Sequence, residues 1–491
     1  MFIDDKGRRT MTCFIGLDLG TTSVKALLFD ERGNLLGAAD VEDALSTPHP
    51  GWIEQNAEHW VELSAEVIRK AVREAGVDPG EVSALSISSQ GITCVPVDRG
   101  FKPLRDAINW LDQRAADEMD EVVAAVGLQE LYGITGKSPY PGYTLPVIMW
   151  LKRNEPEVFE DTHKFLLPHD FLCARFCGAP VTDHTMAGGT MLYDVPTQQW
   201  SDRLLGLFGI DRGLLPELRW AGEPAGHLTK EASALLGLPE KTLVATGGQD
   251  QKVAAYGANL GLGSVTISLG TCAAMEFLFD HAPSHPARSL AACSYLWKDA
   301  WVLEACINTA CGAIKWARNA LFHDLSYDGI DSLAASCETS GGVFFYPYLQ
   351  GSGTPYNIPA CGAFTGLTLG ATRAELARAV LEGVAMEIRA NLDSAGEAGM
   401  GVERIGVFGG GSKSRVLCQM IADAAGRSIQ AFTTPEMGAF GAAKLAAGAV
   451  GIMGFAPPVG EKWEPDAGQN ARYNELYSAY QKSRESILAL G

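Results

Sequence analysis

Two apolar runs joined by a short glycine–threonine turn, near the start of the chain, constrain its fold more than any other feature. Phe14 to Leu19 and Val24 to Phe29 each have the length of a β-strand, and Gly20, Thr21 and Thr22 lie between them. This pattern predicts a β-hairpin. The turn can present backbone N–H groups and hydroxyls to an anion, because no bulky side chain blocks the approach.

A partial repeat of this turn lies about half the chain further on. Leu269-Gly270-Thr271 repeats Leu19-Gly20-Thr21, and it also follows an apolar, β-branched run. Two such hairpins favour two related domains that face one polyphosphate, although three residues also recur by chance. Asp18 sits just before the first turn, where a carboxylate can hold a metal ion beside a phosphate. The alternative is an ordinary hairpin with an exposed aspartate.

Length and composition exclude several classes of protein. The chain has 491 residues, of which 47% are apolar, so it can build several domains with large cores. Its formal charge of −19 argues against a nucleic-acid partner or an anionic-membrane surface. It has no apolar run of spanning length, its start does not resemble a signal peptide, and its 11 cysteines include no CxxC pair. We therefore expect a cytoplasmic protein with reduced thiols and no membrane partner.

A second polar segment follows the apolar run that begins near Val244. It reads Gly247-Gly248-Gln249-Asp250-Gln251, so a predicted strand ends at two glycines and an acidic residue follows. The glycines permit close approach of a ligand, which Asp250 would then face. The alternative is that Asp250 caps the helix that comes next.

The first half of the chain also carries a group of aromatic, amide and carboxylate residues. The strand predicted over Val82 to Ile87 runs into polar residues that include Gln90, and such strand ends are good candidates for a site in an α/β sheet. Trp52 lies in an earlier loop, and Trp110 and Asp112 lie in a later one. An aromatic face with carboxylate and amide groups is typical of a sugar site. The alternative is a core tryptophan beside a surface ion pair.

The second half contains a strand, a glycine loop and a helix in succession. The strand is predicted over Ile405 to Phe408, the loop over Gly409 to Ser414, and the helix from there to Ala425. This order suits nucleotide binding at a helix N-terminus. The loop is not a Walker A motif, because Ser412 stands where that pattern needs glycine.

Several helices are predicted from their end signals. Asn56 is a plausible N-cap for a helix that ends at Gly76, and Thr372 with Glu375 forms a capping box. The residues from about Pro457 onward predict a linker followed by a terminal helix.

Taken together, these segments resemble the FGGY family of carbohydrate kinases, which has an actin-like, ribonuclease-H-like ATPase fold. Each match is weak alone, but the set follows the family order over nearly the whole chain. The matching segments are Asp18–Ser23, Gly51–Gln55, Trp110–Arg114, Gly247–Gln251, Ser268–Thr271, Tyr346–Leu349, Gly366–Leu367, Arg378–Gly383 and Gly409–Ser414.

The resemblance implies an α/β fold of two actin-like domains with the active site in a cleft between them. Each domain would have a mixed five-stranded sheet flanked by helices. The N-terminal, sugar-binding domain would cover residues 1–255, and the C-terminal, nucleotide-binding domain would cover 256–456. A helical tail would occupy 457–491.

The resemblance also implies the reaction and its residues. The enzyme would transfer the γ-phosphoryl group of ATP to a hydroxyl, with Asp250 as catalytic base and Asp18 beside Mg²⁺. The ATP-binding residues would be Gly20, Thr21, Thr22, Ser23, Gly270, Thr271, Gly410, Gly411 and Ser412. The substrate-binding residues would be Trp52, Gln90, Trp110, Asp112, Asp250 and Gln251.

The expected acceptor is a ketose, above all a pentulose such as xylulose, or a sugar alcohol. Xylulokinases typically have a Met-His pair after the glutamine, where this chain has Gly91-Ile92, and the Arg-Glu pair of glycerol kinases is also absent. The glycine loop Gly351 to Pro355 departs from the usual Gly-Glu-Arg-x-Pro. A glycerol or short-polyol kinase and an actin-like ATPase that acts through partner binding are the alternatives. The sequence is also compatible with a homodimer.

Overall fold

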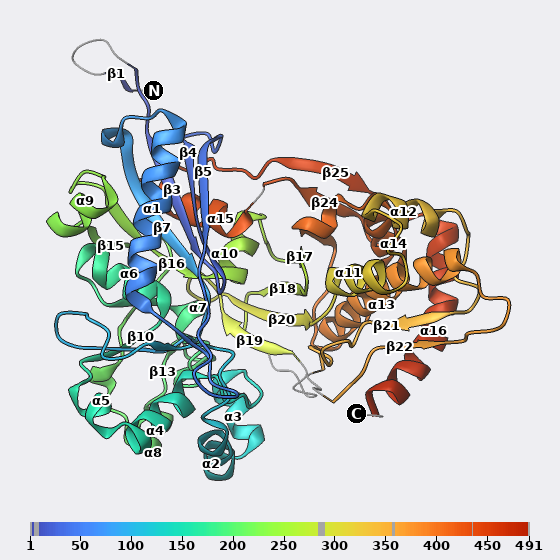
Figure 1. The fold of residues 1–491 in the computed structure, drawn as a ribbon, viewed down its shortest axis with the longest axis horizontal. Coiled ribbons are helices and arrows are strands. Elements are labelled where there is room, and N and C mark those ends of the chain that lie inside the picture. The colour runs from blue at the N-terminus through green and yellow to red at the C-terminus, as the bar shows by residue number, and fades with distance from the viewer. Residues whose placement is uncertain (1, 4–8, 283–289, 356–358, 435, 490–491) are drawn as a thin grey trace. The chain divides into compact units, whose positions relative to one another are not determined.

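The computed structural model describes residues 2–3, 9–282, 290–355, 359–434 and 436–489, which form two compact units (Figure 1). The first unit comprises Met1–Asn259, Ala292–Trp301 and Glu436–Pro457, and the second comprises Leu260–Ala291, Val302–Pro435 and Pro458–Gly491. Each unit therefore collects segments from distant parts of the chain. The sequence-based boundaries at residues 255 and 456 stay predictions.

The first unit is built on a six-stranded mixed sheet. Its strands lie in the order β15 (Pro224–His227), β16 (Leu243–Gln249), β7 (Val82–Ser89), β3 (Cys13–Leu19), β4 (Ser23–Asp30) and β5 (Leu35–Glu42). β16, β7 and β3 are parallel, whereas the other neighbours are antiparallel. The predicted hairpin is β3–β4, and the glycine–threonine turn joins its strands.

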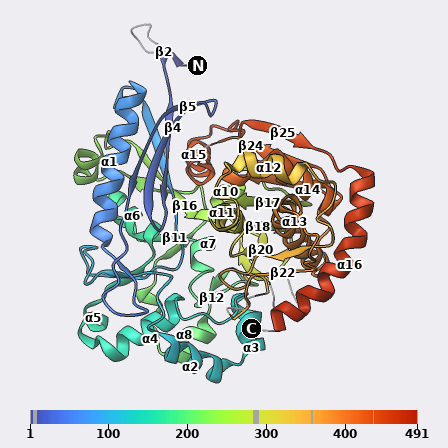
Figure 2. The ribbon, with the colours of Figure 1, turned by 45° about the vertical axis from the view of Figure 1, so that its right-hand side comes forward.

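Helices cover both faces of this sheet (Figures 1 and 2). Ile15 of β3 belongs to the buried core that also includes the apolar side of α1 (Ala57–Ala75). Its neighbour Gly16 points to the opposite face, because successive residues of a strand alternate. A Cβ at Gly16 would lie 1.7 Å from the carbonyl oxygen of Ala439, in α15 (Met437–Ala449). Glycine thus lets this late helix pack directly on β3.

The predicted helix ends are confirmed where the sequence carries cap signals. The Asn56 side chain accepts hydrogen bonds from the first N–H groups of α1, and Gly76 ends that helix with φ 65°. Thr372 and Glu375 form the capping box of α13 (Arg373–Glu397). These signals act locally, which explains why the sequence alone is sufficient to find them.

The remaining elements of the first unit are mostly short. Its further helices are η1 (Pro79–Glu81), α2 (Ala116–Val126), α3 (Leu128–Thr135), α4 (Thr144–Asn154), α5 (Pro156–Asp161), α6 (Pro168–Cys177), α7 (His184–Ala187), α8 (Asp202–Phe208), η2 (Arg212–Leu214), α9 (Lys230–Leu236) and α10 (Asp250–Gly257). Its minor strands are β1 (Phe2–Ile3), β2 (Arg9–Thr10), β6 (Glu54–Gln55), β8 (Val95–Val97), β9 (Ala107–Ile108), β10 (Lys164–Leu166), β11 (Val181–Asp183), β12 (Tyr193–Asp194), β13 (Gln199–Trp200) and β14 (Glu217–Arg219).

The second unit is built on a mixed sheet. Its strands lie in the order β20 (Trp301–Ile307), β18 (Ala273–Phe279), β17 (Ser264–Leu269), β23 (Arg404–Phe408), β24 (Ile429–Phe432) and β25 (Val459–Trp463). The strand β19 (Ala291–Ser294) falls almost wholly within the segment Ala292–Trp301 of the first unit. The other elements are α11 (Cys311–Ala320), α12 (Tyr327–Ala335), β21 (Phe344–Tyr346), β22 (Ala363–Thr365), α13, η3 (Gly410–Lys413), α14 (Arg415–Ala425) and α16 (Ala467–Ala489). The predicted succession of strand, glycine loop and helix is confirmed as β23, η3 and α14.

Two expectations about the fold are wrong, one about the number of strands in each sheet and one about the C-terminal segment. Both sheets have more than five strands, because antiparallel strands such as β15 and β25 extend their edges. The stretch after Pro457, expected to be a linker before a terminal helix, contains β25 before it reaches α16. β25 is short and largely exposed, with Val459 at 65% exposure. Its sequence therefore lacks the apolar alternation that identifies a half-buried strand.

Candidate active site

Three parallel strands of the first unit bring the predicted catalytic and metal-binding segments to one sheet edge. Asp18 of β3 lies opposite Ser88 of β7, and Gly248 of β16 lies opposite the same serine. Only β7 therefore separates the end of β3, which carries Asp18, from the end of β16, which leads into Asp250. Adjacent strands are about 4.8 Å apart, so the two strand ends are close together. In open α/β sheets, ligands bind beyond this carboxyl edge.

Asp18 is a desolvated carboxylate. Its Oδ1 accepts a hydrogen bond from the Ser88 hydroxyl at 2.6 Å. Burial raises the pKa of Asp18, and this hydrogen bond and the charge of Lys25 oppose the rise only in part. Gly438 of α15 packs against the group, and a Cβ there would lie 2.8 Å from Oδ1. A cation beside Asp18 would offset the cost of burying its charge.

The surroundings of Asp18 fit a magnesium ion that arrives with a nucleotide. Within the described parts of the chain, no three His, Cys, Asp or Glu side chains gather into a metal cluster. Mg²⁺ is commonly held by one or two carboxylates together with phosphate oxygens and water. One carboxylate next to a glycine–threonine turn matches that mode of binding.

Asp250 is the first residue of α10, directly after β16. Its Oδ1 accepts hydrogen bonds from the backbone N–H of Gln251, at 2.7 Å, and from the side-chain amide of Gln249. The helix cap is Gln249, whose side chain accepts from the N–H groups of Gln251 and Lys252. The alternative in which Asp250 itself is the N-cap residue is therefore wrong. The role of Gln251 toward substrate stays a prediction.

The first turn, Gly20 to Ser23, is anchored to neighbouring loops. The Gly20 N–H donates to the Ser23 carbonyl at 2.9 Å, and Thr22 is exposed at the tip. The Thr21 hydroxyl accepts the indole N–H of Trp110 at 3.0 Å. The Thr21 carbonyl accepts the side-chain amide of Gln55, also at 3.0 Å. The structure thus brings Trp110 and the predicted phosphate turn together.

Gln90 belongs to a buried network of three amides. Its Nε2 donates to Oε1 of Gln55 at 2.9 Å, and its Oε1 accepts from Nδ2 of Asn109 at 3.2 Å. Asn109 also donates to Oε1 of Gln55 at 2.7 Å. These bonds hold together the ends of three separate loops. A direct contact between Gln90 and substrate stays a prediction.

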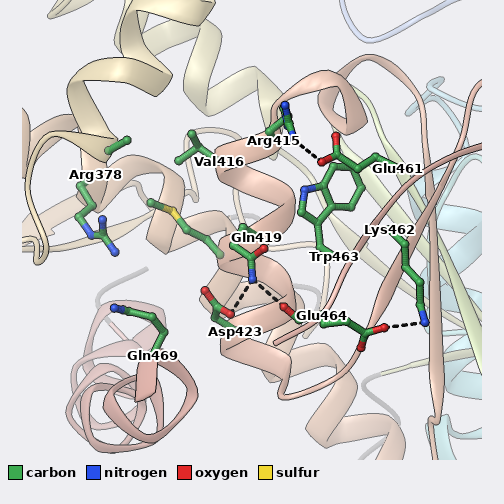
Figure 3. A pocket seen from close by; sticks show the side chains of 12 residues that line it. Arg378, Arg415, Val416, Gln419, Asp423, Glu461, Lys462, Trp463, Glu464 and Gln469 are labelled. Atoms are coloured by element: carbon green, nitrogen blue, oxygen red, sulfur yellow. Dashed lines mark hydrogen bonds and ion pairs between the residues drawn. The ribbon is translucent and has the colours of Figure 1, made fainter. Parts of the chain in front are cut away.

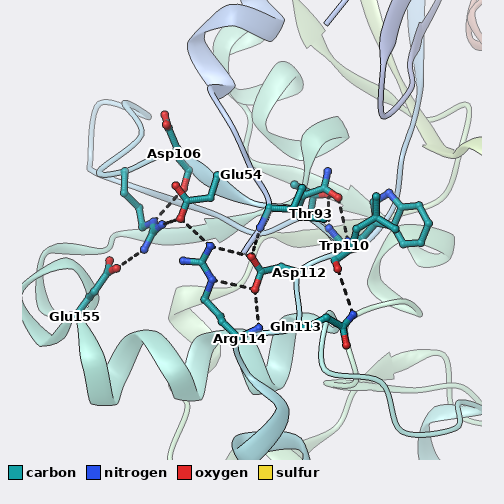
Figure 4. Close-up of polar contacts among 12 residues, drawn as sticks. Glu54, Thr93, Asp106, Trp110, Asp112, Gln113, Arg114 and Glu155 are labelled. Atoms are coloured by element: carbon teal, nitrogen blue, oxygen red, sulfur yellow. Dashed lines mark hydrogen bonds and ion pairs between the residues drawn. The ribbon is translucent and has the colours of Figure 1, made fainter. Parts of the chain in front are cut away.

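Asp112 forms a buried ion pair with Arg114 (Figure 4). The carboxylate accepts from Nε of Arg114 at 2.9 Å, from Nη2 at 2.8 Å and from the Ile53 N–H at 2.5 Å. Arg114 also pairs with Glu54 at 2.7 Å, and its guanidinium lies 3.8 Å from the ring centroid of Trp52. The alternative of a surface ion pair is therefore wrong, because this pair is buried. Substrate contacts of Asp112 and Trp52 stay predictions.

The second unit brings the repeated turn and the glycine loop together. Their strands, β17 and β23, are parallel neighbours. The Thr271 carbonyl accepts the N–H groups of Ala310 and Gly312, each at 2.9 Å, where α11 begins. A Cβ at Gly411 would lie 2.4 Å from the sulfur of Cys311, and Gly410 is exposed. Gly270, Thr271 and the loop up to Ser412 thus share one sheet edge with the start of α11.

Sequence reasoning does not single out Gln55 and Asn109 as site residues. Both amides are buried, and a local sequence gives no sign of that burial. Asn109 precedes Trp110, and Gln55 ends the segment that begins at Gly51. Their closeness to residues with a clear signal is the one feature that points to them.

A pocket of about 520 Å³ lies in the second unit, beside α14 and β25 (Figure 3). Several of its polar side chains are paired with one another. Arg415 bonds Glu461 at 2.5 Å, and Gln419 donates to Oδ1 of Asp423 at 2.9 Å. None of the predicted site residues lines it, so it does not serve as the candidate active site.

Comparison with known proteins decides the family. The model for the N-terminal domain of the FGGY family of carbohydrate kinases matches residues 13–257, and the model for the C-terminal domain matches residues 265–450. This chain belongs to the FGGY family of carbohydrate kinases. Xylulose kinase from Escherichia coli (strain K12) is 32% identical over 97% of this chain and 98% of that protein.

Two further relatives have similar identities. Glycerol kinase from Thermococcus gammatolerans is 31% identical over 96% of each chain. The crystal structure described as a xyloylose kinase from Brucella ovis has a TM-score of 0.89 and 32% identity, and the match covers 98% of this chain and 100% of that one. This FGGY kinase is therefore a phosphotransferase that acts on a sugar or polyol, and the family implies ATP as co-substrate. Among the described residues, no helix combines the length and apolarity needed to cross a bilayer.

Proposed function

We propose that this FGGY kinase transfers the γ-phosphoryl group of ATP to a hydroxyl of a ketose or sugar alcohol, with a pentulose such as xylulose as the main acceptor. One observation carries the proposal: Asp18 and Asp250 lie at the ends of parallel strands in the same sheet. The first carboxylate can hold a metal ion beside phosphates, and the second can take a proton from the acceptor.

In this mechanism Asp250 accepts the proton of the acceptor hydroxyl as its oxygen attacks the γ-phosphorus. The transition state of phosphoryl transfer is loose, so the protein mainly positions the reactants and stabilises charge. Mg²⁺, when bound, would neutralise charge on the phosphate oxygens, and Asp18 would hold it. The turns Gly20–Ser23 and Gly270–Thr271 are assigned to the phosphates, and Gly410–Ser412 to the adenosine side.

The choice of acceptor rests on the relatives. A xylulose kinase at 32% identity supports a pentulose, and a glycerol kinase at 31% supports the alternative of glycerol or another short polyol. Gly91-Ile92 lacks the side chains that either class carries after the glutamine. The acceptor must therefore be identified by assay.

A coupled assay of ADP release tests the proposal over D-xylulose, D-ribulose, D-fructose, xylitol and glycerol. We expect the highest kcat/KM with a pentulose and little ADP without an acceptor. The highest kcat/KM with glycerol would support the alternative acceptor. Equal ADP release with and without acceptors, and no phosphorylated product, would overturn the kinase and favour a partner-driven ATPase. The Asp250→Asn protein, purified in the same way, controls for contaminating kinases.

A further inference from the structure

The backbone of β16 bulges out of the sheet ladder at Thr246 and Gly247, a few residues before Asp250. β16 and β7 are in regular register up to Ala245 opposite Ser86, and the pairing resumes at Gly248 opposite Ser88. Two residues of β16 therefore face one residue of β7, which is a β-bulge. The N–H groups in such a segment need partners other than the neighbouring strand, because buried donors are rarely left unpaired.

His169 supplies one of these partners. Its Nε2 accepts the backbone N–H of Gly247 at 2.9 Å, and its Nδ1 lies 3.0 Å from Oδ1 of Asp170. Because Nε2 accepts, the ring proton is on Nδ1 and is donated to Asp170. The other oxygen of Asp170 accepts the Leu167 N–H at 3.0 Å, at the start of α6. The sulfur of Cys173 makes a longer contact with Nε2, at 3.5 Å.

Thr185 bonds the backbone just beyond the bulge, at Gln249. Its hydroxyl accepts the backbone N–H of Gln249 at 2.9 Å and donates its own proton to Asp183 at 2.7 Å. The Asp183 carboxylate also accepts the N–H groups of Thr185 and Met186, each at 2.9 Å. Both Thr185 and Asp183 are buried, so water does not compete for these bonds.

The two glycines make room on each side of this segment, Gly247 for the backbone of β7 and Gly248 for Thr185 and Asp183. A Cβ at Gly247 would lie 1.8 Å from the carbonyl oxygen of Ile87. A Cβ at Gly248 would lie 2.9 Å from the Thr185 hydroxyl and 3.1 Å from an oxygen of Asp183. A larger residue at Gly247 would clash with the backbone of β7, and a larger residue at Gly248 would displace Thr185 and Asp183.

We propose that His169 and Thr185 are positioning residues, which hold the backbone at Gly247 and Gln249 and thereby aim the Asp250 carboxylate at the acceptor hydroxyl. This inference rests on the proposed role of Asp250 as the base. The two bonds fix the chain on each side of Gly248, and the second bond fixes the residue directly before Asp250. Misplacing a catalytic group by about 1 Å can cost roughly 100-fold in rate.

The test uses isosteric changes in the full-length protein. Thr185→Val keeps the side-chain shape and removes the hydroxyl that accepts the Gln249 N–H. We therefore expect kcat to fall about 10- to 100-fold, while the KM for MgATP stays within about twofold. Thr185→Ser keeps the hydroxyl and should restore most of the rate. His169→Leu should behave like Thr185→Val. His169→Gln, whose amide oxygen can accept the Gly247 N–H, should lose only a few-fold.

Thr246→Val is the matched control in the same strand. The Thr246 hydroxyl is fully buried and has no hydrogen-bond partner among the described residues. The same isosteric change should therefore leave kcat close to the parent. A parental kcat for Thr185→Val, or equal losses for Thr185→Val and Thr246→Val, would overturn the proposal.

Hydrogen exchange gives a readout that does not depend on activity. In Thr185→Val, a peptide covering residues 244–252 should exchange its amide protons faster than in the parent and in Thr246→Val. Unchanged exchange would overturn the positioning role. If the parent phosphorylates no acceptor, the proposed function fails, while the exchange experiment still decides whether these bonds hold the segment.

Discussion

The indole N–H of Trp110 donates a hydrogen bond to the hydroxyl of Thr21 at 3.0 Å. This bond joins a residue assigned to the acceptor to a residue assigned to the phosphates of ATP. Because the Thr21 carbonyl also accepts from Gln55, the turn is anchored through both its side chain and its backbone. Loss of the Trp110 hydrogen bond should therefore also affect the nucleotide.

Replacing Trp110 with phenylalanine tests this link. The change keeps an aromatic ring and removes the N–H, and one neutral hydrogen bond contributes about 0.5–1.5 kcal/mol. We expect kcat/KM for MgATP to fall about two- to tenfold, since about 1.4 kcal/mol corresponds to a factor of ten. A double-mutant cycle with Thr21→Val measures the coupling. Strictly additive effects would show that the hydrogen bond does not couple Trp110 to Thr21.

Asp250→Asn should abolish nearly all acceptor-dependent turnover without loosening the fold. Loss of a general base costs about 10²- to 10⁴-fold in rate. Because Gln249 caps α10, the melting temperature should stay close to the parent. Binding of MgATP and acceptor, measured by calorimetry, should change by no more than a few-fold. Asp78→Asn, at the exposed cap of η1, is the control. A parental kcat for Asp250→Asn would remove this residue from the mechanism.

Asp112→Asn should act mainly on stability. The carboxylate is buried and bonded to Arg114, and breaking a buried pair by removing one charge costs about 3–5 kcal/mol. We expect a clear loss in the free energy of unfolding in urea and little change in the KM for MgATP. The KM for the acceptor should rise because Trp52 stacks on Arg114. Asp106→Asn, at an exposed residue just before β9, is the matched control. Unchanged stability would contradict the structural role.

Burial of neutral His184 should lower the free energy of unfolding in weak acid, where the unfolded chain takes up a proton at this residue. Burial lowers the pKa of its imidazole from 6.5 to about 4, and its ring stacks on Trp220 at 3.5 Å. The unfolded chain binds the proton first, so this contribution to stability is complete above pH 6.5. It is lost as the pH falls to about 4 and amounts to about 3 kcal/mol, at about 1.4 kcal/mol for each pKa unit.

The check compares the free energy of unfolding at pH 7.5 and pH 5 for the parent and His184→Gln. The variant should lose less stability over this range. Burial raises the pKa of the neighbouring Asp183 to about 6, so Asp183 favours folding as the pH falls. Both proteins retain this aspartate, so its effect cancels when the change in the free energy of unfolding between the two pH values is compared between them. His227→Gln, at an exposed histidine, should leave the pH dependence of the free energy of unfolding unchanged. The same pH dependence in His184→Gln as in the parent would refute the prediction.

Much of this fold could be predicted from features that act within a few residues. The β3–β4 hairpin depends on its own turn residues, and α1 depends on Asn56 and Gly76 at its ends. The family could likewise be predicted, because its motifs occur in order along the chain. The terminal helix was predicted correctly, whereas β25 was missed because an exposed edge strand needs only one neighbour and little apolar pattern.

The sequence by itself determined the local turns, the helix caps and the candidates Asp18 and Asp250, because those depend on neighbouring residues. Only the tertiary structure decided that α15 packs on β3 through Gly16, and that Gln90 is bonded to Gln55 and Asn109. It also decided that Gly247 and Gln249 are held by His169 and Thr185. These contacts join residues far apart in the chain, and burial and hydrogen-bond partners exist only once the segments have packed together.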